Sequence, residues 1–418
     1  MESLTHIDQL LAAQDVKKAE FQIARMLRDG GPLTAAEQAQ FILRRARARL
    51  MAERPEEALE DLRTARKLDS DLFSHPDVME LFADVNFSRF ELAPVGFADR
   101  ADARTALTWY ESITVDHPDY TNIGWVLYQW GRVLLSEDNI DAAIEKFQEA
   151  LLKPTTVPTL TALCYERLGF VQLVDRRDAA GALAFFSRAA NTYPAGAPAS
   201  WLVRLHLLRS RAFREQHLYT EAMGAAQTAL AAVDPAEADY RAVLTDTHLT
   251  LGEIMASIPG QEVDAAEHLL LFLQNSRRPQ GVDVTWSRVH ETLGDLWFRL
   301  ERYDQAIDAY HNALSYNPYH PWEISLYYQI ARSHYHLREY EKTIAAILHM
   351  LQIAQTDQQP ITDYRVYHLL ANAHFALENY AEAAATYQQA IDLAPPNAEH
   401  LNKLQTYLKF SRELIGRR

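Results

Sequence analysis

The chain has 418 residues, of which 48% are hydrophobic, and it contains only 14 glycines and a single cysteine. Scarce glycine in so long a chain argues against sandwiches, barrels and glycine-rich phosphate loops, and it favours helices, which glycine weakens by roughly 1 kcal/mol per site. The formal net charge of −15 opposes a general nucleic-acid role and adsorption to an anionic membrane, and one cysteine excludes an intramolecular disulfide.

The N-terminal segment reads Met1-Glu-Ser-Leu-Thr-His-Ile-Asp. It lacks the basic start and apolar run of a secretory signal, and no apolar stretch of the chain approaches the roughly 18 residues of a membrane span. We therefore expect a cytoplasmic protein without membrane insertion. The first helix, around Leu4 to Ala13, is expected to cap the N-terminal end of the fold.

A pattern of one small residue, a large residue four positions later and another small residue after three more recurs along the chain. Such an offset places all three side chains on one face of a helix. Successive copies begin 37 to 48 residues apart. The small residues that open the copies are Ala19, Ala58, Ala106, Ala143, Ala182, Ala222, Ala266, Ala306, Thr343 and Ala383. In the seventh copy, Leu270 and Leu273 are predicted to follow Ala266 on the buried face.

The clearest copy runs from Val289 to Pro318 and reads VHETLGDLWFRLERYDQAIDAYHNALSYNP. It contains a Leu-Gly pair, an aromatic residue three positions later, a turn, and then alternating small and aromatic residues closed by proline. These residues are Leu293, Gly294, Trp297, Tyr303, Ala306, Tyr310, Ala313 and Pro318. The segment resembles the tetratricopeptide repeat, in which such a glycine lets two helices approach closely and the proline ends the unit.

This resemblance implies an all-α fold, a right-handed superhelical solenoid of antiparallel helix pairs with about ten repeats in residues 1–396. An amphipathic segment within residues 397–418, roughly Ala398 to Ile415, is expected to form a C-terminal capping helix. The repeats are longer than the family period of about 34 residues. We therefore predict extended connections at Ala93–Asp99, Thr192–Ser200 and Asp357–Ile361.

No catalytic motif is visible in the sequence. Phosphate-binding glycine loops and nucleophile elbows do not occur, and His290-Glu291 fails to begin a zinc-binding helix because position 294 is glycine. We predict no catalytic residue, no metal and no cofactor. Cys164 is expected to be a small buried hydrophobe rather than a reactive thiol, and His334 and His374 to fill aromatic positions rather than to bind metal or sense pH.

The family resemblance implies that partners lie on the concave face formed by the first helices of successive repeats. Projection from each Leu-Gly equivalent gives a mainly basic and aromatic set, which suits an acidic partner segment or a free C-terminal carboxylate. Glu253, Glu291 and Asp295 interrupt this trend. The candidate partner-binding residues are Arg132, Arg167, Phe170, Arg204, Arg211, Arg214, Arg332, Tyr335, Arg365 and Asn372.

The alternative interpretation of these arginines is a solvated helix face with weak intrahelical ion pairs. A chaperone-tail clamp is not predicted, because Arg365 and Asn372 both fall in the last repeat and the other clamp residues are missing. We predict a non-catalytic protein-interaction scaffold that binds a protein or peptide. The alternatives are a structural or regulatory subunit that uses its outer face or ends, an enzyme with a cryptic site, and an RNA-binding repeat that uses the basic run Arg44–Arg49.

Overall fold

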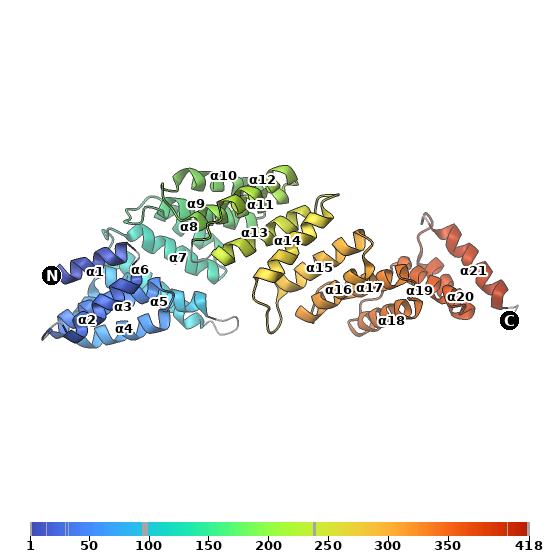
Figure 1. Cartoon of the computed structure of the whole chain (residues 1–418), viewed down its shortest axis with the longest axis horizontal. Helices are drawn as coiled ribbons and strands as arrows, with labels where there is room; N and C mark the ends of the chain where they lie inside the picture. Colours follow the sequence, from blue (N-terminus) through green and yellow to red (C-terminus); the bar gives the residue numbers. More distant parts are fainter. Residues whose placement is uncertain are drawn as a thin grey trace. The chain divides into compact units, whose positions relative to one another are not determined.

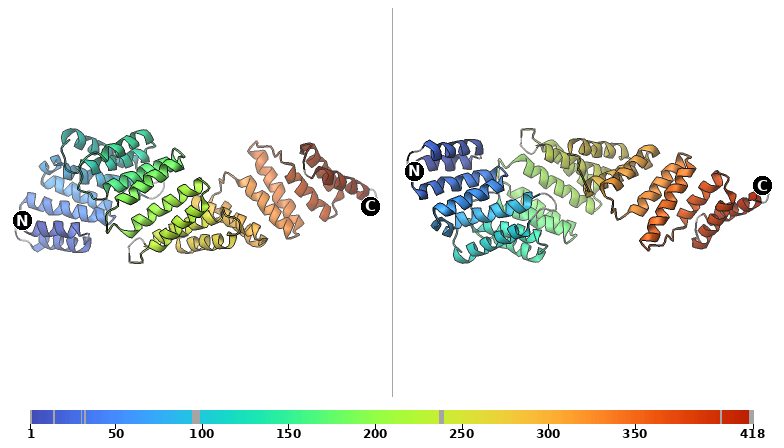
Figure 2. Two further views of the ribbon diagram at one scale, coloured as in Figure 1. Left: turned by 90° about the horizontal axis from the view of Figure 1, so that it is seen from above. Right: turned by 90° about the horizontal axis from the view of Figure 1, so that it is seen from below.

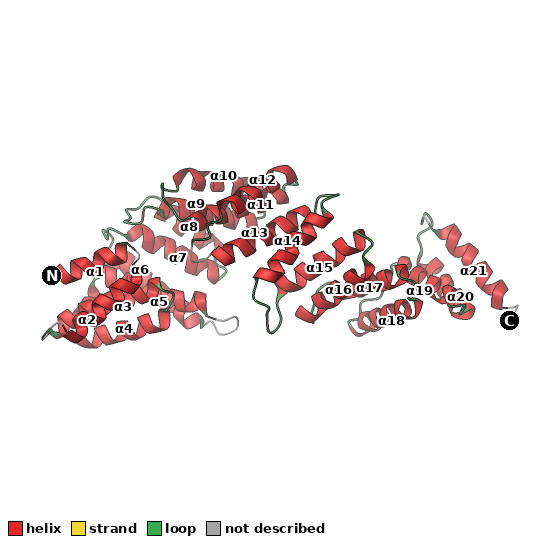
Figure 3. Ribbon diagram, in the orientation of Figure 1, coloured by secondary structure: helices red, strands yellow, loops and turns green. Residues whose placement is uncertain are grey.

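The computed structural model describes residues 2–13, 15–29, 31, 33–93, 99–236, 240–398 and 400–415. Within these ranges the regular secondary structure is entirely helical (Figure 3). The chain divides into an N-terminal body, residues 1–198, and a C-terminal body, residues 199–418. Each body is described by itself.

The N-terminal body holds ten α-helices and one short 3-10 helix. They are α1 (Glu2–Ala12), α2 (Val16–Asp29), α3 (Ala35–Met51), α4 (Pro55–Leu68), η1 (Asp71–Ser74), α5 (Pro76–Leu92), α6 (Arg100–Asp116), α7 (Ile123–Ser136), α8 (Ile140–Ala150), α9 (Leu160–Val174) and α10 (Ala179–Thr192). The C-terminal body continues with eleven more. They are α11 (Ala199–Glu215), α12 (Tyr219–Ala232), α13 (Tyr240–Met255), α14 (Glu262–Asn275), α15 (Val284–Arg299), α16 (Tyr303–Tyr316), α17 (Glu323–His336), α18 (Tyr340–Thr356), α19 (Tyr364–Ala376), α20 (Tyr380–Leu393) and α21 (Leu401–Ile415).

Each odd-numbered helix packs against the even-numbered helix that follows it, from α3 with α4 through α19 with α20 (Figure 1). With the α1–α2 pair, the chain forms ten helix pairs, which we call repeats 1 to 10. Successive first helices also contact each other within a body, for example α5 with α7 and α11 with α13. Figure 2 shows the helices of each body stacked in this order. The predicted solenoid of antiparallel helix pairs is confirmed.

The predicted small residues lie where the two helices of a repeat meet. Nine of the ten are buried at 0% exposure on the second helix of their repeat, namely Ala19, Ala58, Ala106, Ala143, Ala182, Ala222, Ala306, Thr343 and Ala383. A larger side chain at these positions would hold the helices apart, since protein interiors are packed to crystal density. The small residues recur because the close approach of the helices recurs.

The seventh copy needs a correction of one residue. Ala265 and Ala266 are both buried, but Leu269 is fully buried whereas Leu270 is 46% exposed. A Cβ atom added to Gly252 on α13 would lie 2.6 Å from a methyl carbon of Leu269. The large residue that fills the space beside the first helix is therefore Leu269, and Ala265 precedes it at the expected offset of four.

Glycine on the first helix allows the second helix to approach, as predicted for Gly294. A Cβ atom at Gly294 would lie 2.4 Å from the Tyr310 ring, and one at Gly131 would lie 2.6 Å from the Phe147 ring. Both rings are fully buried. Because carbon atoms that are not bonded rest roughly 3.5–4.0 Å apart, these positions leave no room for a side chain.

A second recurring feature is the turn inside each repeat. In seven repeats a residue two or three positions beyond the end of the first helix adopts a positive φ near 60° although it is not glycine. These residues are Glu53, Asp138, Arg177, His217, Glu301, Arg338 and Glu378. The left-handed residue ends the first helix and reverses the chain, which is the usual geometry of a helix C-terminus.

The connections between repeats agree partly with expectation. Residues 193–198 and 357–363 do form extended connections, whereas most of the predicted Ala93–Asp99 connection lies outside the described residues. The sequence analysis missed the η1 turn before α5, where the Phe73 ring is buried against Phe82. At the C-terminal end, α21 packs on α20 through the buried Leu404 and Leu408. The division into a 1–396 solenoid and a 397–418 cap stays a prediction.

Candidate functional site: the first-helix face

The first helices of repeats 6, 7 and 8 present a connected row of charged side chains. We define the first-helix face by Arg211 and Arg214 on α11, Thr250 and Glu253 on α13, Ser257 in the turn after α13, and Arg288, Thr292, Asp295 and Arg299 on α15. On α15 these residues are spaced by four, three and four positions, so they lie along one side of the helix. Hydrogen bonds join the three helices at this face.

Glu253 lies at the centre of the first-helix face. Its Oε2 atom accepts a hydrogen bond from Arg214 Nη1 at 2.8 Å, and its Oε1 atom accepts one from Arg288 Nη2 at 2.7 Å. The Glu253 side chain is 15% exposed, whereas that of Arg288 is 58% exposed. One largely buried carboxylate therefore bridges two arginines from the helices on either side of it.

A cavity of about 290 Å³ opens on this face. Three arginines and two carboxylates line it, which gives one net positive charge. Those residues are Arg214, Arg288, Arg299, Glu253 and Asp295. The Arg299 guanidinium is exposed and donates one hydrogen bond, to the Ala256 carbonyl at 3.1 Å. Such an arrangement suits a partner that offers a carboxylate, because guanidinium groups bind carboxylates through paired hydrogen bonds.

Two of the predicted arginines, Arg132 and Arg332, share two kinds of contact in repeats 4 and 9, and Arg132 is in addition paired with Glu91. Each donates from Nη1 to the glutamine three residues earlier, Gln129 or Gln329, at 2.8 Å. Each guanidinium also lies over an aromatic ring of the preceding repeat: Phe87 at 5.0 Å for Arg132 and Phe298 at 4.5 Å for Arg332. Cation–π contacts of this kind stabilise the junction between neighbouring repeats.

The predicted residue Asn372 also has an internal partner. Its Oδ1 atom accepts a hydrogen bond from the hydroxyl of the fully buried Tyr387 at 2.7 Å. Tyr310 donates in the same way to Asp295 at 2.8 Å, and Tyr110 donates to Asp84 at 2.6 Å. In each of these repeats, a tyrosine on the second helix has its acceptor on the first helix, directly after the small residue.

The remaining predicted residues are spread over several helices. Arg211 and Arg214 lie together on α11, and Arg211 donates to Thr250 at 3.4 Å. Arg167 and Phe170 are half-buried on α9, and Arg204 is exposed on α11. On α17, the Tyr335 ring lies edge-on to Tyr340 at 5.6 Å. Arg365 is paired with Asp363 at the start of α19 at 2.7 Å.

Of the ten predicted residues, Arg211 and Arg214 lie in the first-helix face as defined here. Arg288 and Arg299, which line its cavity, were missed by the sequence analysis. The signal was present, because both are at helical spacing from Asp295, a residue that the projection had already placed on this side. Their charge partners on neighbouring helices were not visible from spacing along one helix.

The N-terminal body holds a half-buried acidic pair on α5. Glu80 accepts two contacts from Asn122 Nδ2, at 2.9 and 3.0 Å, and Asp84 accepts from Tyr110. Burial, together with the charge of Asp84, raises the pKa of Glu80 to about 8. Burial also raises the pKa of Asp84. The Asp84 charge therefore favours the protonated form of Glu80, and both carboxyl groups are hydrogen-bonded to side chains of the same body.

The basic run Arg44–Arg49 is largely neutralised by carboxylates. Arg44 pairs with Asp8 at 2.7 Å, while Arg45 and Arg49 both reach the buried Asp61, at 2.7 and 2.8 Å. Nucleic-acid binding needs cations that are available to phosphate. These three arginines instead tie α3 to α1 and α4.

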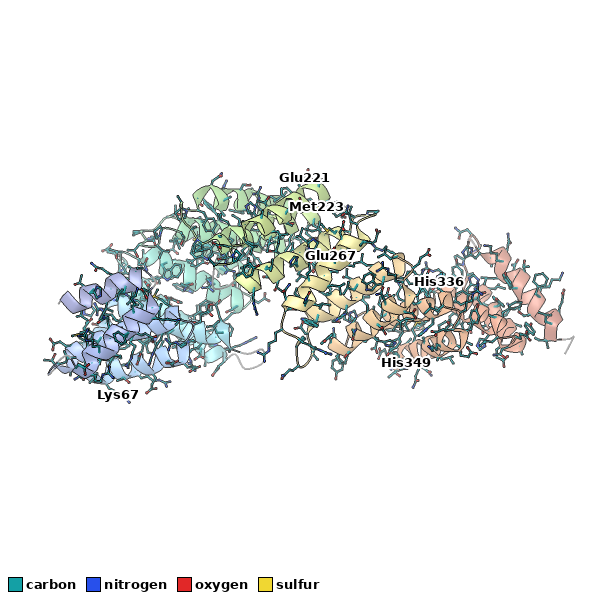
Figure 4. All side chains as sticks on the ribbon, in the orientation of Figure 1. Lys67, Glu221, Met223, Glu267, His336 and His349 are labelled. Atoms are coloured by element: carbon teal, nitrogen blue, oxygen red, sulfur yellow. The ribbon has the colours of Figure 1, made fainter. Side chains whose placement is uncertain are left out.

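His334 and His374, which were expected to fill aromatic positions, are both half-buried on the first helices of their repeats. His334 Nδ1 lies 2.7 Å from Glu339 Oε2. His336, labelled in Figure 4, stacks on Tyr303 with ring centroids 4.5 Å apart. No group of three or more potential metal ligands occurs in the part of the chain that the structure describes. Cys164 is buried as predicted, and burial raises the pKa of its thiol to about 12.

Comparison with known proteins bears on the class of this chain. The tetratricopeptide repeat model matches residues 287–320 and 364–397, which are repeats 8 and 10. A search of curated proteins found no match. Among the described helices, none is both long and apolar enough to cross a bilayer.

Solved structures with a similar fold include a signal transduction ATPase with a tetratricopeptide repeat sensor from Pyrococcus horikoshii. The match has 14% identity and a TM-score of 0.50, and it covers 89% of this chain and 57% of that one. The C-terminal part of a repeat-containing protein from Cytophaga hutchinsonii matches at 15% identity and a TM-score of 0.49, over 67% of this chain and 99% of that one. The Cut9–Hcn1 hetero-tetramer of the APC/C matches at 14% identity and a TM-score of 0.41, over 98% and 83%.

The helix pairs, their small interface residues and their close glycine contacts define an all-helical solenoid of repeated pairs. The tetratricopeptide repeat model matches two of those pairs, repeats 8 and 10. These two repeats belong to the tetratricopeptide repeat family, and the chain has the fold of that family.

Proposed function

We propose that this protein is a non-catalytic scaffold that binds a protein or peptide on its first-helix face. The observation that carries the proposal is Glu253, held between Arg214 and Arg288 beside a cavity of about 290 Å³. Tetratricopeptide repeat proteins are in general protein-interaction scaffolds. The side chains come from three stacked helices, so the surface is preorganised and little ordering is needed on binding.

The partner that suits this face is a segment with an acidic side chain or a free C-terminal carboxylate. Arg288 and Arg299 are exposed at the cavity, and each keeps N–H donors for a further acceptor. A partner carboxylate can replace Glu253 as an acceptor for Arg288 without leaving a buried charge unpaired. Affinity should therefore fall as ionic strength rises, because the exposed arginines are screened by salt.

Cross-linking from one chosen position tests which face is used. A photo-reactive phenylalanine is placed at Ser257, which is exposed and lines the cavity, or at Asn312, which is exposed on the second helix α16. After irradiation in lysate of the source organism, the captured proteins are identified by mass spectrometry. We expect a partner that is captured from Ser257 and not from Asn312.

Two double variants with the same change in net charge test whether the cavity arginines are needed for capture. Arg288→Glu/Arg299→Glu should abolish capture from Ser257, whereas Arg241→Glu/Lys342→Glu should leave it intact. The second pair has the same change in net charge and lies on exposed positions outside the cavity. Capture that is equal in both double variants, or capture from Asn312 alone, contradicts the proposed face.

A second candidate, a subunit of a larger assembly joined through its end, is favoured by α21. This helix buries Leu404 and Leu408 on α20 but exposes Tyr407, Phe410 and Ile415. Exposed apolar residues on a terminal helix are typical of an interface with another protein. Phe410→Ser should then release a protein partner that Arg288→Glu/Arg299→Glu retains.

A further inference from the structure

Two connections between repeats in the C-terminal body carry large exposed side chains. Val282 lies in the connection from α14 to α15 and Val284 is the first residue of α15, and they are 63% and 66% exposed. Tyr319 and Trp322 belong to the connection from α16 to α17, and they are 90% and 63% exposed. We call these four residues the loop patch. Isolated exposed apolar residues are common, but four on two neighbouring loops form a patch that calls for a physical cause.

The first loop is hydrogen-bonded to the last residue of α16, from which the second loop continues. The backbone N–H of Asp283, between the two valines, donates to the carbonyl of Tyr316 at 2.9 Å. Arg278 Nε of the first loop donates to the Tyr316 hydroxyl at 3.0 Å. Tyr316 ends α16, three residues before Tyr319. The connection that follows α14 (Figure 1) therefore lies against the end of α16, where the second connection begins.

The second loop holds its aromatic side chains outward by burying the residue between them. His320 is 7% exposed, and its Nε2 lies 3.3 Å from Glu291 Oε2 on α15. Its Nδ1 accepts a hydrogen bond from the backbone N–H of Trp322 at 3.1 Å. Pro318 and Pro321 restrict the backbone on either side. The rings of Tyr319 and Trp322 are thus presented by a constrained loop, so binding costs little conformational entropy.

The size of the loop patch indicates a short segment rather than a folded partner. The four side chains expose on the order of 500 Å², since an aromatic side chain contributes roughly 200 Å². A stable interface between two folded proteins buries about 800 Å² on each side. A second copy of this chain would find too little surface here, whereas a peptide of a few residues can cover all of it.

The charge beside the loop patch indicates what else the segment carries. Arg277, in the first loop, is exposed and has no hydrogen-bond or ion-pair partner among residues 240–398 or the other described ranges. Tyrosine, tryptophan and arginine are the residues that dominate binding energy at protein interfaces. We propose that the loop patch is a second binding surface, separate from the first-helix face, for a short peptide segment with apolar side chains and one acidic residue that meets Arg277.

The test uses the full chain and a displayed library of random twelve-residue peptides. Peptides enriched on the wild type are synthesised with a fluorophore, and their binding is measured by fluorescence polarisation. We expect the enriched set to share apolar residues next to Asp or Glu. Tyr319→Ser/Trp322→Ser should weaken binding at least tenfold, and Arg277→Glu should weaken it about threefold to tenfold, in line with hot-spot behaviour.

The matched control is Phe21→Ser/Val115→Ser, which removes two exposed apolar side chains of the N-terminal body. It should bind the peptides as the wild type does. Equal binding by Tyr319→Ser/Trp322→Ser, or an unenriched library, overturns the proposal. The proposal is also overturned if light scattering shows a dimer that Tyr319→Ser/Trp322→Ser abolishes, because a second copy of this chain then covers the loop patch. Flotation with phosphatidylcholine vesicles that is lost in the same variant also overturns it, in favour of a lipid surface.

Discussion

Replacing Gly294 with alanine tests whether close approach of the helices, rather than helix propensity, governs the first-helix glycines. In an open helical position this change stabilises a protein by about 1 kcal/mol. At Gly294 the new Cβ atom would lie 2.4 Å from Cε1 and 2.5 Å from Cδ1 of Tyr310. The ring must then move by about 1 Å to restore normal contact distances.

The Tyr310 ring is poorly placed to move. It is fully buried, and its hydroxyl is hydrogen-bonded to Asp295 at 2.8 Å. Overpacking of this kind costs about 1–3 kcal/mol. After the gain in helix propensity is subtracted, we expect Gly294→Ala to destabilise repeat 8 by up to about 2 kcal/mol.

Gly224 on α12 provides the matched control, because a Cβ atom there would have no heavy atom within 4 Å. Gly224→Ala should stabilise its repeat by up to about 1 kcal/mol, so the two substitutions are expected to have opposite signs. Hydrogen exchange measured by mass spectrometry reports opening free energies for each helix pair, which suits a repeat array better than one global unfolding curve. If Gly294→Ala slows exchange in α15 and α16, the close-approach argument is refuted.

Three further predictions concern the turns and the buried titratable groups. Glu301→Gly should stabilise repeat 8 by about 0.5–1 kcal/mol in urea unfolding, because residue 301 has a φ of 60° that a side chain disfavours. Glu80→Gln should be more stable than the wild type at pH 8 and equal to it near pH 4. With a pKa of about 8, folded Glu80 retains a proton that the unfolded chain releases above its ordinary pKa, so wild-type stability falls as pH rises between these values. His268→Gln should reduce the loss of stability on acidification from pH 7 to pH 5. Burial lowers the pKa of both His248 and His268, so below pH 6.5 the unfolded chain binds more protons than the folded chain does. The free energy of unfolding therefore decreases as the pH is lowered.

Each of these has its own control and contrary result. Glu301→Ala keeps a side chain at the strained turn, so a gain equal to that of glycine would exclude backbone strain as the cause. Glu60→Gln removes an exposed carboxyl on α4 and should leave the pH dependence of stability unchanged. If Glu80→Gln also leaves this pH dependence unchanged, the Glu80 carboxyl is ionised throughout. His6→Gln, at an exposed position of α1, controls for the number of histidines. Acid sensitivity that His268→Gln leaves intact would place its origin elsewhere.

The repeat pattern was predictable because it follows from one physical need, the close approach of two helices. That need selects small residues at fixed offsets, and nine of the ten predicted positions are fully buried. The exception is instructive. Ala265 and Ala266 are both small, so the sequence offered no distinction between them. The position of Leu269 beside Gly252 decides the register, and that contact joins two helices.

The candidate site was only partly predictable for a related reason. Helical spacing indicates which side of a helix a residue lies on, but not whether its charge is already satisfied by a neighbour about 40 residues away. Arg214 faces Glu253 across 39 residues, and Asn372 accepts from Tyr387. Arg132 and Arg332 appeared in the sequence as free cations, yet each lies over an aromatic ring of the repeat before it.

The contacts of Arg132 and Arg332 also bear on how this chain could be shortened, lengthened or recombined. In both places the sequence pattern is Asp-x-x-Phe on one first helix and Tyr-Gln-x-small-Arg on the next, at Asp84–Phe87 with Tyr128–Arg132 and at Asp295–Phe298 with Tyr328–Arg332. The hydrogen bonds from Tyr110 to Asp84 and from Tyr310 to Asp295 each join the two helices of one repeat, whereas the arginine contacts a ring of the preceding repeat. A single repeat grafted elsewhere would lose the phenylalanine ring of the preceding repeat, and its arginine would keep only the tyrosine ring of its own helix, Tyr128 or Tyr328. The smallest segment that keeps this junction is therefore a pair of repeats. Gene duplication or engineering that moves such a pair preserves the junction, whereas moving one repeat breaks it.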